Sequence, residues 1–322
     1  MKVLHIMAGL PEEGGRPIQP YIASQIASLI KAGIEVDILN LNEYGRGWKK
    51  YWKGIGVLRR QIRQTHYDLL HGHFSYCGWV ARFQSRLPVV VSLMGRDLLG
   101  YQDNTWRGYF DRQITLSLVR MVDYVIVKSE DMARHVRGVN KLAVIPNGVD
   151  LEFFKPMDYT ECRQALGIND HEFVVLFPAN PGIPRKNCAL ARQAVEVLKT
   201  KYEIPIRFWV IFNRPQQELP QAMNAADVLL MTSIYEGSPN VVKEAMACNL
   251  PIVSVPVGDV PKIITGSQNC FIAGYDPESL GEKLFEVALT GRRSNGREHI
   301  QDLCLEKIAE RILTIYGEIL ST

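Results

Sequence analysis

Short runs of apolar residues alternate with longer stretches of helical periodicity along the whole chain. The longer stretches, such as Ile18–Lys31, Trp106–Met121 and Asn187–Lys201, place apolar side chains three and four residues apart and predict amphipathic helices. Alternating strands and helices favour parallel sheets that are covered on both faces. The short runs predict eleven strands, enough for two sheets: Val3–Met7, Glu35–Leu41, Leu69–His71, Val89–Leu93, Tyr124–Val127, Leu142–Ile145, Phe173–Phe177, Arg207–Phe212, Val228–Met231, Ile252–Val255 and Cys270–Ile272.

The boundary between the two predicted sheets falls at Pro146–Asp150, where proline, asparagine and glycine end the sixth strand and turn the chain. We therefore expect an α/β chain with one domain over residues 1–150 and a second over residues 151–301. A final helix within residues 302–322 has an apolar side that must pack on another element.

Length and composition are those of a globular protein. The chain has 322 residues, of which 47% are hydrophobic, and this excludes a disordered chain and suits about two domains. No apolar run approaches the roughly 18–20 residues of a membrane-spanning helix, and the N-terminus has no signal-peptide pattern. Six scattered cysteines without a CxxC pair argue against disulfides and zinc. We therefore expect a cytoplasmic protein.

The formal charge is uneven. Residues 1–155 carry 21 basic and 14 acidic residues, a balance of +7, whereas residues 156–322 carry 16 and 20, a balance of −4. A basic half favours an anionic partner, which leaves a phospholipid surface, a polyphosphate-linked substrate or nucleic acid open at this point. Chance variation in solvated surface charge is the plain alternative.

Several common nucleotide and hydrolase motifs are absent from the sequence. No GxGxxG follows a predicted strand, which argues against an NAD-dependent dehydrogenase. No GxxxxGK[ST] or GxSxG occurs, so a P-loop enzyme and an α/β-hydrolase are disfavoured. These absences direct attention to other loops at the ends of strands.

Two such loops carry weak signals. The first strand runs into a glycine-rich turn that includes Gly14 and Gly15, where backbone N–H groups can meet a phosphate. A purely structural loop is an equal alternative. His71 and His73 end another strand and can hydrogen-bond a ligand, although for His71 we favour a structural role. Two histidines without a third ligand do not make a metal site.

The strongest signal follows the strand that ends at Met231. Ser238 is a candidate N-cap and Pro239 suits the first turn of a helix, so the following N–H groups would face the turn and bind an anion. Glu236 and Glu244 flank this site, and carboxylates accept hydrogen bonds from vicinal hydroxyls. A ligand that carries both a diphosphate and hydroxyls, such as a nucleotide sugar, fits this combination. The N–H groups expected to face it belong to Asn240, Val241 and Val242.

These residues resemble a known family. Glu236-x7-Glu244 followed by Pro251-Ile-Val-Ser254 is similar to the signature of family 4 retaining glycosyltransferases. Val144–Asp150 with Phe154-Lys-Pro156, Leu70-His-Gly-His73 and Asn224–Leu230 resemble further stretches of that family, in the same order. The residues from Glu236 to Glu244, together with Val257-Gly-Asp-Val260, are most similar to those of bacterial teichuronic-acid-type enzymes, which synthesise cell-surface polysaccharides.

The resemblance implies the GT-B architecture, in which two Rossmann-like domains face a cleft. It implies that residues 1–150 bind the acceptor, that residues 151–301 bind the nucleotide sugar, and that the helix in 302–322 returns to the N-terminal domain. It also implies that no cofactor and no metal is needed. Charge on the leaving diphosphate is then met by helix N-termini and basic side chains.

Roles follow for individual residues by the same resemblance. Glu244 would bind the ribose hydroxyls, Glu236 would lie against the donor sugar, and Lys186 would meet the diphosphate. The backbone from Gly237 through Ser238, Asn240 and Val241 to Val242 would contact sugar and diphosphate.

Two positions depart from the family pattern. Pro181 stands where the family usually has arginine, which leaves Arg185 as the substitute or weakens the stabilisation of the leaving group. Met94 stands where the family often has histidine, and methionine is a poor hydrogen-bonding partner for a sugar. Either His73 or Asp97 then takes more of the catalytic work, or the activity is low.

We therefore expect a retaining glycosyltransferase that moves a sugar from a nucleoside diphosphate, with UDP as the expected nucleotide, to a lipid-linked or glycan acceptor in cell-surface polysaccharide synthesis. No nucleic acid is expected as a partner. The alternatives are a UDP-sugar epimerase on the same fold and a non-catalytic subunit that binds sugar nucleotides, the latter because of Met94 and Pro181.

One segment suggests a membrane surface. Residues 46–63 contain seven basic residues, three aromatic residues and no acidic residue. Cations favour an anionic lipid surface and aromatic rings favour its headgroup boundary, which predicts peripheral docking on the inner face of the cytoplasmic membrane. An ordinary basic helix or a site for an anionic glycan is the alternative. The residues expected to contact the membrane or the acceptor are Arg46, Trp48, Lys49, Lys50, Trp52 and Lys53.

Overall fold

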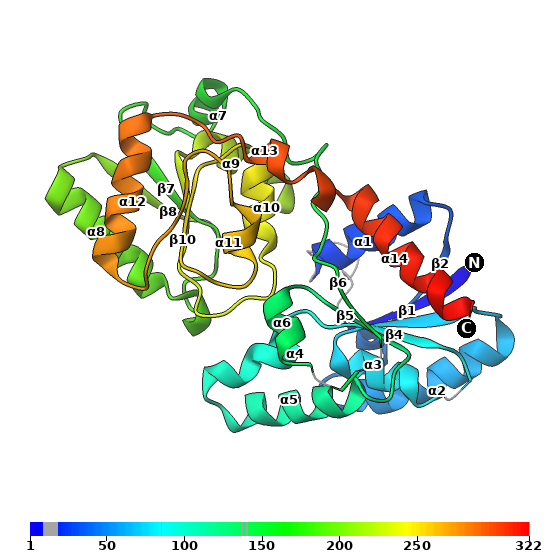
Figure 1. Cartoon of the computed structure of the whole chain (residues 1–322). Coiled ribbons are helices and arrows are strands. Elements are labelled where there is room, and N and C mark those ends of the chain that lie inside the picture. The colour runs from blue at the N-terminus through cyan, green and yellow to red at the C-terminus, as the bar shows by residue number, and fades with distance from the viewer. Residues whose placement is uncertain (9–18, 85, 137, 140, 322) are drawn as a thin grey trace. The chain divides into compact units, whose positions relative to one another are not determined.

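Two parallel β-sheets organise the chain (Figure 1). The structure, a computed structural model, describes residues 1–321 apart from 9–18, 85, 137 and 140. The chain divides into unit 1, which is Met1–Gly148 with Leu305–Thr322, and unit 2, which is Val149–Cys304. The expected α/β class with two parallel sheets is confirmed, and all eleven predicted strands are present.

Unit 1 contains a six-stranded sheet with the order β2-β1-β3-β4-β5-β6. Helices α2, α3 and α5 pack together over one face of the sheet, and α1 packs with α14 over the other (Figure 1). The strands are β1 (Lys2–Met7), β2 (Glu35–Asn40), β3 (Leu69–His73), β4 (Val89–Ser92), β5 (Tyr124–Val127) and β6 (Leu142–Val144). The helices are α1 (Pro20–Lys31), α2 (Lys49–Gln64), α3 (Ser75–Arg82), α4 (Arg96–Leu99), α5 (Trp106–Leu118), α6 (Glu130–Arg134) and α14 (Leu305–Leu320).

Unit 2 contains a five-stranded sheet with the order β11-β10-β9-β7-β8. Helix α8 packs against α12, and α10 packs against α13 (Figure 1). The strands are β7 (Phe173–Phe177), β8 (Ile206–Val210), β9 (Val228–Met231), β10 (Ile252–Ser254) and β11 (Cys270–Ile272). The helices are α7 (Tyr159–Ala165), α8 (Cys188–Tyr202), α9 (Leu219–Ala225), α10 (Asn240–Ala247), α11 (Val260–Ile263), α12 (Pro277–Thr290) and α13 (Gly296–His299).

The central strands are buried on both faces, which explains why they are continuous apolar runs rather than alternating ones. β4, β5 and β9 are buried at every position. A parallel strand between two helical layers has no solvent-facing side, so each of its side chains must be compatible with the core.

Each sheet has a topological switch point. In unit 1 the second strand lies on one side of β1 and the third on the other, and in unit 2 β8 and β9 flank β7 in the same way. Loops that leave the carboxyl ends of two such strands diverge over opposite faces and open a crevice, where ligands bind in open α/β sheets. The fold therefore directs attention to the loops after β1 and β3 and to those after β7 and β9.

Helix α14 belongs to unit 1 although it follows all of unit 2 in the sequence. Its buried face includes Ile308, Ile312, Ile315 and Tyr316, and it packs against α1. The apolar pattern alone did not indicate the partner of this face, whereas the family resemblance implied the N-terminal domain.

Two further sequence expectations can be compared with the structure. All six cysteines are free in the structure. Among the described residues, no helix combines the length and apolar character needed to cross a membrane.

Candidate active site

Two loops meet at the switch point of unit 2. The loop after β7 ends in a short 3₁₀ turn at Pro184–Lys186, and the loop after β9 runs from Thr232 to Pro239. The Ile234 N–H donates to the Arg185 carbonyl at 2.8 Å, and the Thr232 hydroxyl donates to the Lys186 carbonyl at 3.0 Å. These bonds fix the backbone of Arg185 and Lys186 beside the β9 loop, so their side chains project toward its residues.

Glu236 is the centre of this site. Its Oε1 accepts a hydrogen bond from the Arg185 guanidinium at 2.7 Å and another from the Lys186 ammonium at 2.5 Å. The Arg185 guanidinium also lies over the Tyr235 ring, 5.7 Å from its centroid. The structure therefore brings together three residues that the sequence predicts for the site, and the role of Arg185 as a substitute for the missing arginine stays a prediction.

Burial and charge oppose each other in this cluster. Burial lowers the pKa of Lys186, while Glu236 opposes the shift. Burial alone would raise the pKa of Glu236, but the charges of Lys186 and Arg185 outweigh it and the pKa is lowered. Glu236 is thus a carboxylate at neutral pH, beside two cations.

The start of α10 corrects one sequence expectation. The helix begins at Asn240, so Pro239 occupies the N-cap position rather than the first turn, and Ser238 precedes the cap. The Val242 N–H donates to the Pro239 carbonyl at 3.3 Å and is not free. The Ser238 hydroxyl instead accepts a hydrogen bond from the Lys243 ammonium at 3.0 Å.

A second group of charges lies around α10. Lys243 is fully buried, and burial lowers its pKa to about 8. Burial raises the pKa of Glu244 to about 7, against the opposing charge of Lys243. Asp259 also has a raised pKa because of burial, and its Oδ1 has no hydrogen-bond partner among the described residues.

The Val257–Val260 loop packs closely against the loop that contains Glu236. A Cβ on Gly258 would lie 2.6 Å from the Gly237 carbonyl oxygen, and Gly258 has a φ of +55°. Only glycine allows this close approach together with this backbone conformation. Lys243 and Asp259 are charged residues buried beside this loop that were not predicted from the sequence, although both lie within the family motifs.

In unit 1 the predicted His73 belongs to a buried cluster with His5 and His71. One ring nitrogen from each of these three side chains lies within 4.8 Å of the other two, and each side chain is fully buried. His5 Nδ1 and His73 Nε2 share a hydrogen bond of 2.9 Å, His71 Nε2 lies 2.8 Å from the Ser92 hydroxyl, and His71 Nδ1 lies 2.5 Å from the Tyr316 hydroxyl. Burial lowers the pKa of all three, to about 3 for His5, so they are neutral at physiological pH.

His5 is the third member of this cluster. Its proximity to His71 and His73 was not predicted from the sequence. The hydrogen bonds make the cluster a structural network that joins β1, β3, β4 and α14. A catalytic role for His73 and the absence of a metal stay predictions.

Asp97 likewise has structural partners. Its Oδ1 accepts hydrogen bonds from the Ser75 N–H at 2.9 Å and from the Ser75 hydroxyl at 3.1 Å, and its Oδ2 accepts one from the Met94 N–H at 2.8 Å. Burial raises its pKa, and these bonds oppose the shift. Its contacts hold the ends of β3 and β4 together, and its catalytic role stays a prediction. Gly14 and Gly15 lie outside the described residues.

The basic segment, residues 46–63, covers nearly all of α2, and the six residues predicted to contact the membrane or the acceptor lie at its start. Trp48 and Trp52 are each 67% exposed, and Arg46, Lys49 and Lys53 are exposed beside them. Lys50 differs from the others, because its ammonium donates to Asn42 Oδ1 at 2.7 Å and lies over the Tyr51 ring. Five of the six predicted surface residues therefore share an exposed surface, which we call the α2 basic–aromatic patch.

Comparison with known proteins agrees with the two-unit architecture. Residues 18–153 match the family model "Glycosyltransferase Family 4", and residues 175–289 match the model "Glycosyl transferases group 1". The chain is a glycosyltransferase.

This glycosyltransferase is 25% identical over 315 residues to a D-inositol 3-phosphate glycosyltransferase of Actinosynnema mirum, an alignment that covers 82% of the chain and 76% of the relative. The enzyme of that name from Saccharomonospora viridis is also 25% identical, with 82% and 73% covered. These names support sugar transfer rather than the epimerase alternative. The more specific resemblance to teichuronic-acid-type enzymes is not supported by them.

Solved structures share the GT-B fold. Sucrose-phosphate synthase (tll1590) from Thermosynechococcus elongatus superposes with a TM-score of 0.82 at 18% identity, covering 100% of this chain and 99% of that chain. Anabaena Alr3699/HepE in complex with UDP-glucose gives a TM-score of 0.74 at 17% identity, with 99% and 100% covered. The expected GT-B class is confirmed.

Proposed function

We propose that this glycosyltransferase moves a sugar from a UDP-sugar to a lipid-linked or glycan acceptor, with retention at the anomeric carbon, in cell-surface polysaccharide synthesis. Unit 2 binds the donor and unit 1 binds the acceptor. The observation that carries the proposal is the pair of cations on Glu236 at the switch point of unit 2. The Anabaena neighbour with UDP-glucose bound supports the choice of donor.

In this proposal the donor diphosphate competes with Glu236 for Arg185 and Lys186. As the bond between the anomeric carbon and the diphosphate oxygen breaks, the oxygen gains negative charge, and both cations stabilise it. The acceptor hydroxyl attacks the anomeric carbon and its proton passes to the leaving diphosphate. No metal takes part.

The carboxylates recognise hydroxyl groups in this proposal. Glu236, released from its cations, accepts hydrogen bonds from the donor sugar, and Glu244 accepts them from the ribose. Backbone groups from Gly237 to Val241 contact the sugar and diphosphate. Lys243 holds that backbone through the Ser238 hydroxyl, and Gly258 leaves room for the Gly237 carbonyl.

The α2 basic–aromatic patch docks on an anionic membrane surface in this proposal, and a lipid-linked acceptor is met there. Exposed tryptophans beside exposed lysines suit the headgroup region. The names of the relatives make inositol phosphate a second acceptor to be tested.

The test is a thermal-shift titration of the full chain with UDP, GDP and ADP, followed by product analysis with the matching sugar nucleotides. A UDP concentration of 100 times its Kd should stabilise the protein by about 2.7 kcal/mol. Formation of a glycoside with retained configuration supports the proposal. Epimerised donor, or binding of UDP-sugars without transfer to any glycan, lipid-linked or inositol-phosphate acceptor, contradicts it.

A further inference from the structure

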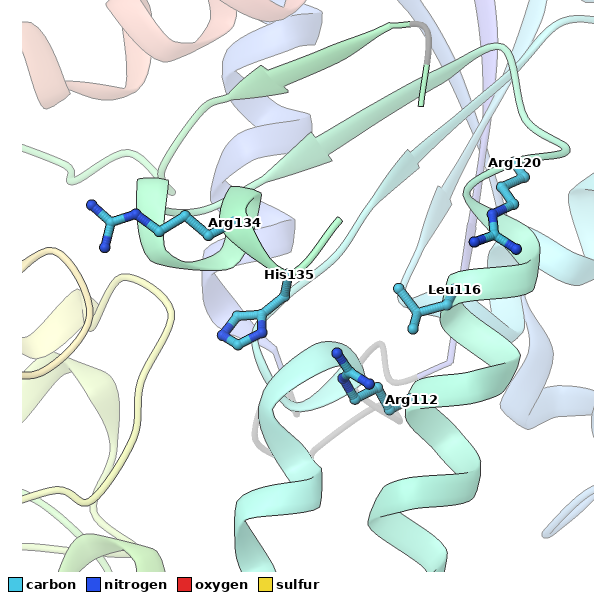
Figure 2. A pocket seen from close by; sticks show the side chains of 5 residues that line it. All are labelled: Arg112, Leu116, Arg120, Arg134 and His135. Carbon is cyan, nitrogen blue, oxygen red and sulfur yellow. The ribbon is translucent and has the colours of Figure 1, made fainter. Parts of the chain in front are cut away.

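A groove between α5 and α6 of unit 1 has an unusual lining. It encloses about 320 Å³ and is lined by Arg112, Leu116, Arg120, Arg134 and His135 (Figure 2). None of these five residues is acidic, and three carry a permanent positive charge. Figure 2 shows Arg112 and His135 facing each other across the groove, Arg120 beyond Leu116, and the Arg134 side chain extending away from the other four.

Helical spacing explains how one helix supplies most of this lining. Arg112, Leu116 and Arg120 are four residues apart, so they lie along one side of α5 and of the turn that follows it. Arg134 and His135 close the groove from the end of α6.

The arginines of the groove have no carboxylate partner. In the part of the chain that the structure describes, no ion pair involves Arg112, Arg120 or Arg134, and the Nε of Arg112 is buried without a hydrogen-bond acceptor. By contrast, Arg107 on another side of the same helix lies 3.9 Å from the Asp111 carboxylate. A buried guanidinium N–H without an acceptor costs free energy, and an anion in the groove would supply the acceptor.

An aromatic ring positions two of the groups. The Arg112 guanidinium lies 5.1 Å from the centroid of the Tyr101 ring, and the His135 ring meets Tyr101 edge-on at 6.1 Å. Stacking of this kind restricts the guanidinium plane, which favours bidentate binding of an oxyanion. Leu116 adds an apolar contact that a free ion would not use.

We propose that the groove binds the phosphate of a phosphate ester, with the guanidinium groups on the phosphate oxygens and Leu116 against the esterified carbon atoms. A volume of about 320 Å³ is at the lower end of the roughly 300–1,000 Å³ of small-ligand sites, which suits a phosphate with a small organic group. The site is additional to the donor site, because all five residues belong to unit 1 and the donor loops belong to unit 2. The proposal does not depend on sugar transfer.

Two sources could supply this chemistry, namely a soluble sugar phosphate and the headgroup of an anionic phospholipid. The experiment uses the full chain and measures both. Glucose 6-phosphate is titrated against glucose by calorimetry, and phosphatidylglycerol vesicles are compared with phosphatidylcholine vesicles by sedimentation. UDP affinity is measured in the same samples, so that loss of the donor site is recognised separately.

The main variant is Arg112→Gln with Arg120→Gln, and the matched control is Arg107→Gln on the same helix. We expect the double variant to lose at least tenfold in affinity for the phosphate probe, while the control changes less than twofold. Arg134→Gln, at an exposed position, should lose severalfold. Binding of glucose 6-phosphate identifies a soluble ester. Vesicle binding that the double variant weakens, without binding of glucose 6-phosphate, identifies a headgroup. The proposal is overturned if neither phosphate probe binds, or if the double variant and Arg134→Gln bind as the wild type does.

Discussion

Glu236 holds two cations on one carboxylate oxygen, and the proposed donor must displace it from both. Such an arrangement keeps Arg185 and Lys186 oriented before the substrate arrives, so little reorganisation is needed when the leaving group gains charge. At the scale of single residues, the mechanism therefore depends on what the cations do in the transition state rather than on how tightly they hold the donor.

Lys186→Ala should lower kcat by roughly 100-fold and change KM for the UDP-sugar much less, because charge on the diphosphate is greatest in the transition state. Steady-state kinetics of transfer measure both constants. Lys199→Ala, an exposed lysine of α8, is the control and should behave as the wild type. A raised KM with unchanged kcat would make Lys186 a ground-state binder instead.

Glu244→Gln tests the cost of a buried carboxylate. Burial raises the pKa of Glu244 from 4.5 to about 7, so the folded wild type binds a proton below pH 7 and carries a buried charge above it. The variant should match the wild type in stability near pH 4, gain up to roughly 3 kcal/mol between pH 4.5 and about 7, and keep that gain at higher pH, since each pKa unit corresponds to about 1.4 kcal/mol. Chemical denaturation at pH 4.5, 6 and 8 measures this difference.

The same variant should bind UDP at least tenfold more weakly at pH 8, because a neutral amide replaces the charged acceptor of the ribose hydroxyls. A gain in stability with unchanged UDP affinity would remove Glu244 from the proposed ribose site.

At the scale of secondary-structure elements, sequence periodicity was enough to predict the strands. Four of them, including β5 and β9, have the predicted bounds, because a buried parallel strand is an apolar run with polar ends. The start of α10 differed, since proline fits both the cap and the first turn, and the buried Lys243 takes the Ser238 hydroxyl that would otherwise cap the helix.

The pairing of strands that are far apart in the sequence explains why the contact between His5 and His71 was not predicted. His5 lies beside His71 because β1 and β3 pair in parallel with these two residues in register. Nothing in the local pattern around His5 indicates this neighbour, and register is decided by the packing of both strands together. The ion pairs of Glu236 were likewise not predicted, because Arg185 and Lys186 lie on a different loop, and the family resemblance related these residues only to the donor.

The predicted membrane docking depends on the α2 basic–aromatic patch. Lys49→Glu with Lys53→Glu should abolish binding to phosphatidylglycerol vesicles at low salt, since each basic residue near an anionic surface contributes about 1 kcal/mol and the change reverses its sign. Arg60→Glu with Arg63→Glu makes the same charge change at the other end of the helix and should reduce binding much less. Equal loss in both variants would assign the binding to net charge and not to the α2 basic–aromatic patch.

At the scale of the whole molecule, the chain passes between the units twice, at Gly148–Val149 and at Cys304–Leu305. The two passages run together: the Val149 N–H donates to the Leu303 carbonyl at 2.9 Å, and a Cβ on Gly148 would lie 3.0 Å from the Leu305 Cα. Unit 1 is completed only by α14, whose Tyr316 meets the buried histidines.

Tyr316→Phe should therefore destabilise unit 1 by roughly 1–3 kcal/mol, because His71 Nδ1 loses its partner in a fully buried site. Hydrogen exchange by mass spectrometry should show faster exchange in β1 and β3 and unchanged exchange in β7 and β9. Thr314→Ala on the exposed side of α14 is the control. Equal loss of protection in both units would show that they unfold as one.

The late position of α14 also sets an order of events on the ribosome. Val149–Cys304 must be translated before the helix emerges, which takes roughly 8 to 30 seconds at 5–20 residues per second. The second unit can therefore complete its fold while the first still waits for its last helix. During that interval the nascent first unit exposes the apolar surface that α14 later covers, and this is where a chaperone acting during synthesis would bind it.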